Sequence, residues 1–356
     1  MQIHVTDPAF QTTLFAALLA VALAVSARKT DRSDVLSPSQ SQELKGFAIL
    51  AIMLGHIGYG LSANNAFLFP LSVMAGVGVN IFLFLSGLGL AISAGAAPRS
   101  LKDFYIHRFR PLFMTLWLAL TAIFAMDFLL LGKTYSLATM VQSYLGWYPS
   151  AVMATDVDSP LWYMTFLFAY YLAFPLLYRS RRPYFSAAAL FAYGVAFTVL
   201  VKPFVGTTVW LYGVHTAAFP LGVLAAHLLP RLRQTAARLR SPSVRLVAAA
   251  ALAGGVAFAA THAGLMQWYE QPMSLAAMFA VIGIVALLPV RFALLATFGA
   301  YSFEMFLLHW PLMYRHDVFY AHLPPFAATA AYLFVLPCLG WALQRLAKGK
   351  PFTSTT

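Results

Sequence analysis

The chain has 356 residues, of which 61% are hydrophobic and 10% are charged, and its formal net charge is +12. Soluble domains carry about 25% charged residues, so this composition excludes a single soluble domain and predicts a membrane protein with several spans. The positions of the cations, described below, argue against nucleic-acid binding as the reason for the basic excess.

Eleven apolar segments are long enough to cross a bilayer as helices. They cover residues 9–27, 44–62, 71–94, 112–131, 160–178, 184–201, 206–229, 243–262, 273–290, 292–314 and 326–346. We therefore predict an all-α polytopic membrane protein, a bundle of about 10–11 transmembrane helices. In the stretch 137–155, Tyr144, Trp147 and Tyr148 are typical of an interfacial segment rather than a further span.

Lysine and arginine residues concentrate in alternate loops. One set of loops holds 20 of the 23, and the other holds only Lys133, Lys202 and Arg315. Because cytoplasmic loops carry the excess of Lys and Arg, this asymmetry predicts an N-terminus outside the cytoplasm and a cytoplasmic C-terminus. It also explains most of the basic charge by topology and by contact with lipid headgroups.

The first apolar segment has features of a signal peptide, because residues 24–27 resemble a cleavage site. However, no lysine or arginine precedes it, whereas Arg28 and Lys29 follow it, and this order favours a retained helix. We divide the chain into an extra N-terminal helix with an irregular linker (1–43), a membrane domain (44–346) and a short cytoplasmic tail (347–356).

The first chemically distinctive run extends from Lys45 to His56 and is otherwise apolar. Eleven residues make close to three helical turns, so both side chains share one face, roughly 16 Å apart along the axis. One interpretation is a path for a ligand with an anionic head and a reactive end. The other is a membrane-anchoring lysine and a histidine that bonds to a neighbouring helix. From this helix alone the two are about equally supported.

The second run, residues 76–89, is rich in glycine, with Asn80 and Ser86 as its polar members. Small residues let helices approach closely, and that structural role is common. The functional alternative is that Asn80 and Ser86 line a slot for a thin ligand arm.

The third run is a compact group of cations, His107, Arg108 and Arg110, just before Pro111 and a span. The planar guanidinium suits phosphate recognition. For any single arginine here, membrane anchoring is at least as good an explanation.

The fourth run opens a span at Ser159 and contains Trp162 and Tyr163, which fit an aromatic belt. Asp156 and Asp158 just before it are candidates for contact with a hydroxylated acceptor, although a solvated loop is the better explanation.

The fifth run, residues 299–311, contains Ser302, Glu304 and His309. Ser302 and His309 share a helical face, whereas Glu304 lies about 160° from Ser302, so the three do not form a triad within one helix. A glutamate at this depth needs a partner. We expect Asn80, His215 or an arginine in that role.

Metal chemistry has no support in the sequence. No cysteine and histidine residues have the spacing of metal ligands, so we predict no metal site. The single cysteine, Cys338, is expected to be a small buried residue in its apolar segment.

The five runs, in this order, resemble the motifs of the acyltransferase-3 family of integral membrane acyltransferases. The matching stretches are Lys45-Gly46 through His56, Gly78–Gly87, His107–Pro111, Leu161-Trp162-Tyr163 and Gly299–Pro311, within residues 40–346. Each motif alone is weak, and their order makes the resemblance specific. The chain departs from the family at His107, where Arg-x-x-Arg is frequent, and in its extra N-terminal helix.

The resemblance implies transfer of an acyl group, usually acetyl, from cytoplasmic acyl-CoA to an extracytoplasmic acceptor. Family acceptors are mostly sugar hydroxyls on lipopolysaccharide, exopolysaccharide, peptidoglycan or related lipid-linked glycans, which implies a bacterial inner membrane. The catalytic histidine of the family corresponds to His56, and its CoA-binding cations correspond to Lys45 and Arg110.

We assign the remaining candidates around these residues. Arg108 and His107 join the acyl-CoA-binding group, and Glu304 and His309 join His56 as candidate catalytic groups. Asn80, Ser86, Trp162 and Ser302 are expected to line the substrate channel. We expect acyl-CoA as a co-substrate, no bound cofactor, contact with membrane lipid and no nucleic-acid partner.

A proton-coupled transporter or flippase of a polar ligand is the alternative, since intramembrane histidine and glutamate suit proton coupling. Against it, the sequence shows no paired Gly/Pro-interrupted spans in matching halves.

Overall fold

The structure is a computed structural model that describes residues 3–30, 35–63, 66–97, 99–151, 157, 159–238, 241–262 and 269–349. Asp156, Asp158 and residues 350–356 of the expected tail lie outside the described residues. The chain divides into two compact units, which are described separately below.

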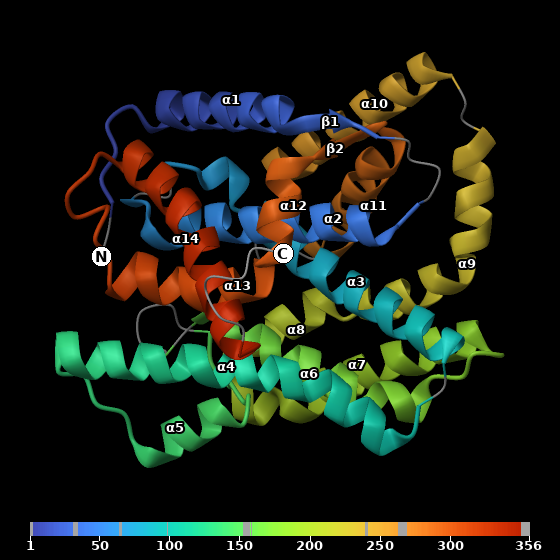
Figure 1. Ribbon diagram of the computed structural model, residues 1–356, viewed down its shortest axis with the longest axis horizontal. Coiled ribbons are helices and arrows are strands. Elements are labelled where there is room, and N and C mark those ends of the chain that lie inside the picture. Colours follow the sequence, from blue (N-terminus) through green and yellow to red (C-terminus); the bar gives the residue numbers. More distant parts are fainter. Residues whose placement is uncertain are drawn as a thin grey trace. The chain divides into compact units, whose positions relative to one another are not determined.

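The first unit comprises residues 1–93, 179–191 and 214–300. Its elements, shown in Figure 1, are α1 (Pro8–Ser26), β1 (Ala27–Lys29), α2 (Pro38–His56), the π turn η1 (Ile57–Leu61), the 3₁₀ turn η3 (Phe69–Leu71), most of α3 (Met74–Ala96), α9 (Ala218–Arg238), α10 (Pro242–His262), α11 (Glu270–Leu287), β2 (Val290–Phe292) and α12 (Ala293–Ala300).

The second unit comprises residues 94–178, 192–213 and 301–356. It contains α4 (Leu101–Leu131), α5 (Leu137–Tyr144), η4 (Ser159–Leu161), α6 (Trp162–Leu177), the C-terminal part of α7 (Pro183–Val205), η5 (Gly206–Thr208), most of α8 (Val209–His215), α13 (Ser302–Trp310), the π turn η6 (Pro311–Arg315) and α14 (Pro325–Ala347).

Nine helical stretches of the described chain are long and apolar enough to cross a membrane, which supports an integral membrane protein. Two differences separate this number from the eleven segments of the sequence. The segments 184–201 and 206–229 lie in one helical stretch, Pro183–Arg238. The segment 292–314 is interrupted at Tyr301 (φ −119°, ψ 16°), which separates α12 from α13. As predicted, the described part of the stretch 137–155, residues 137–151, holds no span, because α5 has only eight residues.

The linker before residue 44 is more regular than expected. Residues 27–29 form β1, and α2 begins at Pro38, six residues before the apolar run. Ser37 and Gln40 form a capping box, in which the Gln40 backbone N–H donates to Ser37 Oγ (3.3 Å) and the Ser37 N–H donates to Gln40 Oε1 (3.4 Å). The cap therefore extends the helix into a polar segment whose composition suggested a loop.

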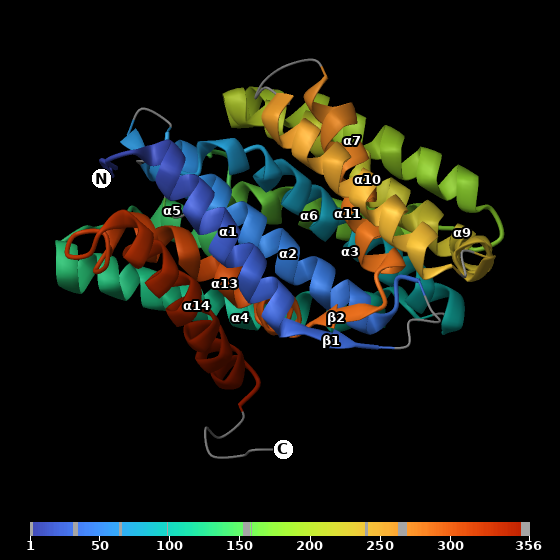
Figure 2. The same cartoon turned by 90° about the horizontal axis from the view of Figure 1, so that it is seen from above.

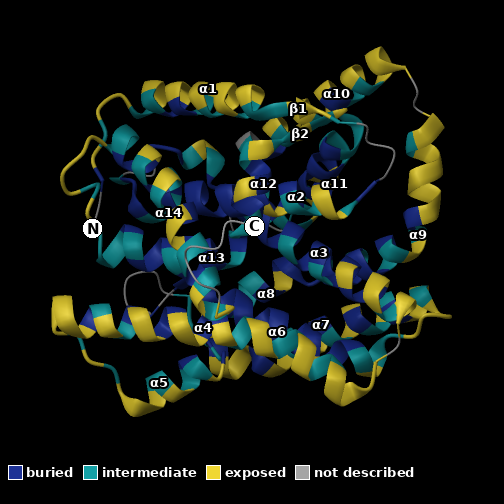
Figure 3. Cartoon of the chain, viewed as in Figure 1, coloured by how far each residue is buried: buried dark blue, intermediate teal, exposed yellow. Residues whose placement is uncertain are grey.

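Helix α2 is the core of the first unit. It buries 13 of its 19 residues, whereas α1 buries only Thr12 and Phe15. Figure 3 shows α2 largely buried and α1 largely exposed or intermediate. A helix that is apolar on every face belongs inside a bundle. The exposed apolar surface of α1 suits lipid.

Glycines set the helix crossings of the first unit. A Cβ on Gly46 of α2 would lie 1.9 Å from the Leu295 carbonyl oxygen of α12, and a Cβ on Gly299 would lie 1.8 Å from the Gln42 oxygen. These two backbones therefore touch directly. The same arrangement recurs where Gly87 of α3 meets Gly222 of α9. The small residues thus have the close-packing role that was one of their two interpretations.

Contacts within each unit join loops that the charge asymmetry places on one side of the membrane. In the first unit β1 pairs with β2, and Ile3 bridges to Ser62 at the other end of the helices. In the second unit Asp127 bonds to Arg315. This agrees with the predicted alternation, and the assignment of the basic side to the cytoplasm stays a prediction.

The expectation that Cys338 is buried is wrong, since its side chain is exposed on α14.

Candidate functional site

His56 is the last residue of α2 and is 8% exposed. The chain continues directly into the π turn η1, and the Tyr59 ring of that turn lies edge-on to the imidazole, with 5.4 Å between centroids. Single π turns are rare and occur frequently at functional sites. The structure therefore places the predicted catalytic histidine, buried, at a change of helical geometry.

Lys45 lies on the same helix, and its side chain is exposed. The ten residues between it and His56 are helical throughout, so the predicted separation of roughly 16 Å along one face holds for this helix. An exposed cation and a buried imidazole on a rigid rod can engage two ends of one extended ligand.

Three polar side chains near the start of α2, none of them among the residues predicted from the sequence, fix its position. Gln40 Nε2 donates to the Val285 oxygen (3.5 Å), and Gln42 Nε2 donates to the Ala296 oxygen (3.0 Å). Glu43 is fully buried and accepts from the Phe292 N–H (2.9 Å). The available signal was the set of polar residues directly preceding an apolar run.

Asn80 joins three helices. His215 Nδ1 lies 2.8 Å from Asn80 Oδ1, and because an amide oxygen only accepts, the imidazole nitrogen donates. Asn80 Nδ2 donates to Ser274 Oγ of α11 (2.8 Å). Asn80 thus bridges α3, α8 and α11 and is fully buried. Ser86 is half-buried on α3, beside the Gly87 crossing.

In the second unit, α4 carries the cation group on its first turns. Arg108 is half-buried, and its guanidinium carbon lies 4.2 Å from the centroid of the Tyr171 ring, whose hydroxyl accepts a hydrogen bond from Nη2. His107 and Arg110 are exposed. Arg108 is therefore held by α6 through a cation–π contact, whereas His107 Nδ1 lies 2.8 Å from the Asp103 oxygen of its own helix.

His309 is fully buried in α13. Its Nδ1 donates to the Phe306 oxygen (2.9 Å) and lies 3.2 Å from the Met305 oxygen. Since carbonyls only accept, the proton is on Nδ1, and Nε2 is the nitrogen able to accept a proton. Trp310 follows, and then the π turn η6. Both candidate histidines therefore sit at the end of an α-helix next to a π turn.

Glu304 has a partner other than those expected. Its Oε1 accepts from Gln344 Nε2 of α14 (3.2 Å), and Gln344 Oε1 in turn accepts from Lys348 Nζ (2.8 Å). The carboxylate is buried on α13. Ser302, at the first position of α13, and Trp162, at the first position of α6, are also buried.

A buried ionic cluster around Asp127 was not predicted as a unit. The carboxylate of Asp127 accepts from Arg315 Nε (3.1 Å), His316 Nε2 (2.8 Å) and the Tyr135 hydroxyl (2.5 Å). Burial and the hydrogen bond to Asp127 raise the pKa of Tyr135, which keeps its hydroxyl protonated as a donor. The cluster ties the end of α4 to Arg315, the last residue of η6, and to His316 after it, so Asp127 bridges two segments of the second unit.

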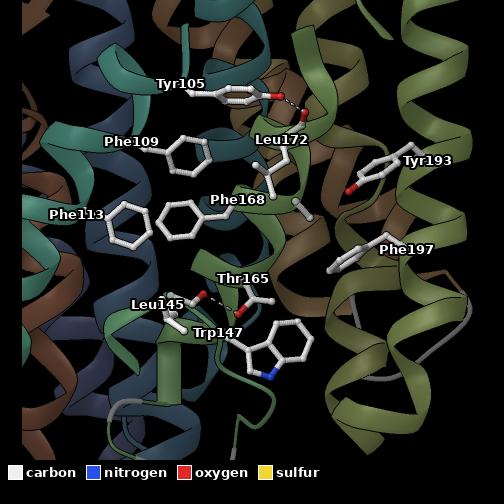
Figure 4. A pocket seen from close by; sticks show the side chains of 12 residues that line it. Tyr105, Phe109, Phe113, Leu145, Trp147, Thr165, Phe168, Leu172, Tyr193 and Phe197 are labelled. Atoms are coloured by element: carbon white, nitrogen blue, oxygen red, sulfur yellow. Dashed lines mark hydrogen bonds between the residues drawn. The ribbon is translucent and has the colours of Figure 1, made fainter. Parts of the chain in front are cut away.

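The second unit also has an open aromatic pocket of about 450 Å³, shown in Figure 4. Rings from α4, α6 and α7 surround it, including Phe109, Phe168 and Phe197. Two of its polar wall groups bond within the wall: the Tyr105 hydroxyl donates to the Leu172 oxygen (2.9 Å), and Thr165 Oγ1 donates to the Gly146 oxygen (3.3 Å). Tyr193 and Trp147 add polar atoms, but most of the lining is aromatic or aliphatic carbon. The interior therefore suits hydrocarbon, and none of the predicted site residues lines it.

Comparison with known proteins assigns the chemistry. A family model described as an acyltransferase domain matches residues 44–345. The chain is also similar to acyltransferase MdmB of Streptomyces mycarofaciens, with 27% identity over 222 residues, which are 52% of this chain and 56% of that protein. The match thus spans about half the length of that relative. No solved structure matches the chain.

Proposed function

Because the chain belongs to the acyltransferase-3 family of membrane acyltransferases, we propose that it moves an acyl group from cytoplasmic acyl-CoA to an extracytoplasmic hydroxyl. The proposed group is acetyl, and the proposed acceptor is a glycan or another cell-surface molecule. The proposed setting is a bacterial inner membrane. That MdmB is named an acyltransferase supports the reaction class.

The observation that carries the proposal is the position of His56. It is buried next to a π turn, on a helix whose exposed Lys45 lies three turns away. A nucleophilic hydroxyl needs a base whose pKa lies near neutrality, and imidazole meets that need. Burial shields the thioester from water.

The candidate contacts for acyl-CoA are exposed cations, and each is proposed on its own: Lys45 in the first unit, and His107 and Arg110 in the second. Lys45, His107 and Arg110 are exposed and suit the phosphates of CoA, whereas Arg108 is restrained by Tyr171. Arginine binds phosphate through paired N–H donors, which makes Arg110 the main anchor among them.

In the proposed reaction, His56 accepts the proton of the acceptor hydroxyl as its oxygen attacks the thioester carbonyl. The carbon–sulfur bond then breaks, and the CoA thiolate leaves and takes up a proton. In a second version His56 itself carries the acyl group and passes it to the hydroxyl. Glu304, which bonds to Gln344, and His309 are proposed as supporting groups, with Asn80, Ser86, Trp162 and Ser302 along the path.

The test uses the purified protein in lipid nanodiscs with acetyl-CoA. Replacing a general base lowers the rate about 100-fold or more, so we expect His56→Ala to abolish acceptor-dependent release of the CoA thiol while acetyl-CoA still binds by calorimetry. In Arg110→Ala we expect binding to weaken about tenfold, as loss of one charge-assisted phosphate contact predicts. Arg99→Ala, a change at another exposed arginine of the same loop region, is the control.

Near-wild-type thiol release by folded His56→Ala protein would refute the assignment of His56. A transporter would move its ligand without releasing any thiol, so the same assay separates the two classes of function.

A further inference from the structure

The short ribbon of β1 and β2 brings two arginines together. The strands are antiparallel, with Ala27 opposite Phe292, Arg28 opposite Arg291 and Lys29 opposite Val290. β1 follows α1 without a gap, and β2 begins three residues after α11 ends, and both helices are candidate spans. Figures 1 and 2 show the ribbon at the ends of these helices. If both helices span the bilayer, the ribbon lies at the membrane surface.

The hydrogen-bond pattern fixes the geometry of the pair. The Thr30 N–H donates to the Pro289 oxygen (3.2 Å), which makes these two residues a hydrogen-bonded pair. Such pairs alternate along antiparallel strands, so Arg28 and Arg291 form the next one, with Cα atoms about 5.5 Å apart and side chains on the same face. Like charges directly opposite each other destabilise a strand pair.

Nothing described near the ribbon neutralises this charge. Arg28 uses Nη1 to bond the Val25 and Ala27 oxygens at the end of α1, which leaves the edge formed by Nε and Nη2 for another acceptor. Arg291 is exposed and has no hydrogen-bond or ion-pair partner within the described ranges. The buried carboxylate of Glu43 is committed to the backbone N–H of Phe292, on the other edge of β2. Asp31 follows in the sequence but lies outside the described residues.

The ribbon is also rigidly mounted. β2 leads directly into α12, whose backbone touches α2 at Gly46 and Gly299. Glu43 of α2 secures the Phe292 N–H. Two guanidinium groups on a fixed base at the membrane surface have the donor geometry that binds one phosphate group.

We propose that Arg28 and Arg291 form a phosphate-binding site at this face of the membrane domain. The phosphate neutralises the opposed arginines and thereby fastens the extra helix α1 to β2. Two molecules present at a membrane surface supply this chemistry, an anionic phospholipid headgroup and coenzyme A. The site is independent of the proposed reaction, and only the coenzyme A source would connect the two.

The experiment measures thermal unfolding and ligand binding of the full chain in nanodiscs. The probes are phosphatidylglycerol added to phosphatidylcholine, and coenzyme A or inorganic phosphate added to phosphatidylcholine discs. We expect the wild-type melting temperature to rise with one of these probes and Arg291→Gln to lose the rise, with apparent affinity about tenfold lower. Arg231→Gln, at an exposed arginine of α9, should keep the full response.

A second variant separates binding from folding. Arg28→Glu places an opposite charge across from Arg291, which stabilises the strand pair without any ligand. We expect this variant to fold as well as wild type and to lose the response to phosphatidylglycerol and to inorganic phosphate. Any response to coenzyme A that it keeps is the one expected from the separate, proposed acyl-CoA contacts.

The outcomes are distinct. A response to phosphatidylglycerol that Arg291→Gln loses identifies the headgroup, and a part of the response to coenzyme A that Arg291→Gln loses identifies the nucleotide. No response of the wild type to any probe, or an equal response in Arg291→Gln, overturns the site. Acetyl-CoA turnover, measured separately, tests the proposed acyl transfer. A failure of the phosphate site therefore leaves the proposed function intact, and the reverse also holds.

Discussion

The two candidate histidines have similar backbone surroundings but different constraints. His56 and His309 each stand within two residues of a π turn. A π turn holds one more residue than an α turn and changes the direction of the side chains that follow. In His309 the Nδ1 bonds to backbone oxygens also fix the ring. His309 therefore has a fixed imidazole with Nε2 as its basic atom, and such a group suits a positioning or proton-transfer role.

Asp127 provides a prediction at the scale of single residues. Asp127→Asn keeps the shape of the side chain but leaves Arg315 and His316 without a carboxylate at a site where Asp127 is fully buried. Removing one partner of a buried ion pair costs about 3–5 kcal/mol. We expect a clearly lower melting temperature in detergent.

The matched control for this change is Asp103→Asn. Asp103 is an exposed aspartate at the start of the same helix, and surface substitutions stay within about 0.5 kcal/mol. Equal melting temperatures of the two variants would contradict a stabilising role for the Asp127 cluster.

At this scale the sequence predicts which residues are unusual but not what they touch. Helical spacing correctly separates Glu304 from Ser302 on α13, and the need of a buried carboxylate for a partner is met. The partner itself, Gln344, follows forty residues later and becomes adjacent only because α13 packs on α14. Gln344 is a common residue type with no local signal, so packing had to be known first.

The glycine crossings determine how closely helices of the first unit approach. A Cβ on Gly87 would lie 2.2 Å from the Phe219 backbone oxygen, so Gly87→Ala must push α3 and α9 apart. Overpacking of this kind costs about 1–3 kcal/mol. We expect reduced thermal stability.

Gly89 lies two residues further along α3, and nothing stands within 4 Å of a Cβ there. In Gly89→Ala, alanine replaces a poor helix former at no steric cost, so we expect stability to rise by about 0.5–1 kcal/mol. Opposite signs for the two variants confirm that contact, not helix propensity, explains Gly87. The same sign for both would refute it.

Among elements, the sequence predicts the apolar helices well and their interruptions poorly. The small residues of 76–89 correctly indicate close approach, because only glycine leaves room for a neighbouring backbone. The interruption at Tyr301 could not be predicted in this way, because no glycine or proline stands at that position. Between α7 and α8 the chain continues through the 3₁₀ turn η5 instead of a loop, so two predicted segments join.

For the whole molecule, the sequence makes a prediction about orientation that the fold alone leaves open. Contacts inside each unit agree with the alternation of the loops, and twenty of the 23 Lys and Arg residues lie in one set of loops. The positive-inside rule assigns that set to the cytoplasm. This orientation is also what places Lys45 and Arg110 with cytoplasmic acyl-CoA, so the mechanism depends on it.

Cysteine labelling tests the orientation directly, because the chain has one cysteine, the exposed Cys338, which Cys338→Ser removes. In that background, Thr134→Cys lies in the exposed turn after α4 and Ser180→Cys in the exposed turn after α6. A maleimide that cannot cross membranes should label Thr134→Cys in intact cells and Ser180→Cys only after the cells are opened. The reverse pattern would place the cations outside, where they cannot bind cytoplasmic acyl-CoA, and the proposed donor would have to be abandoned.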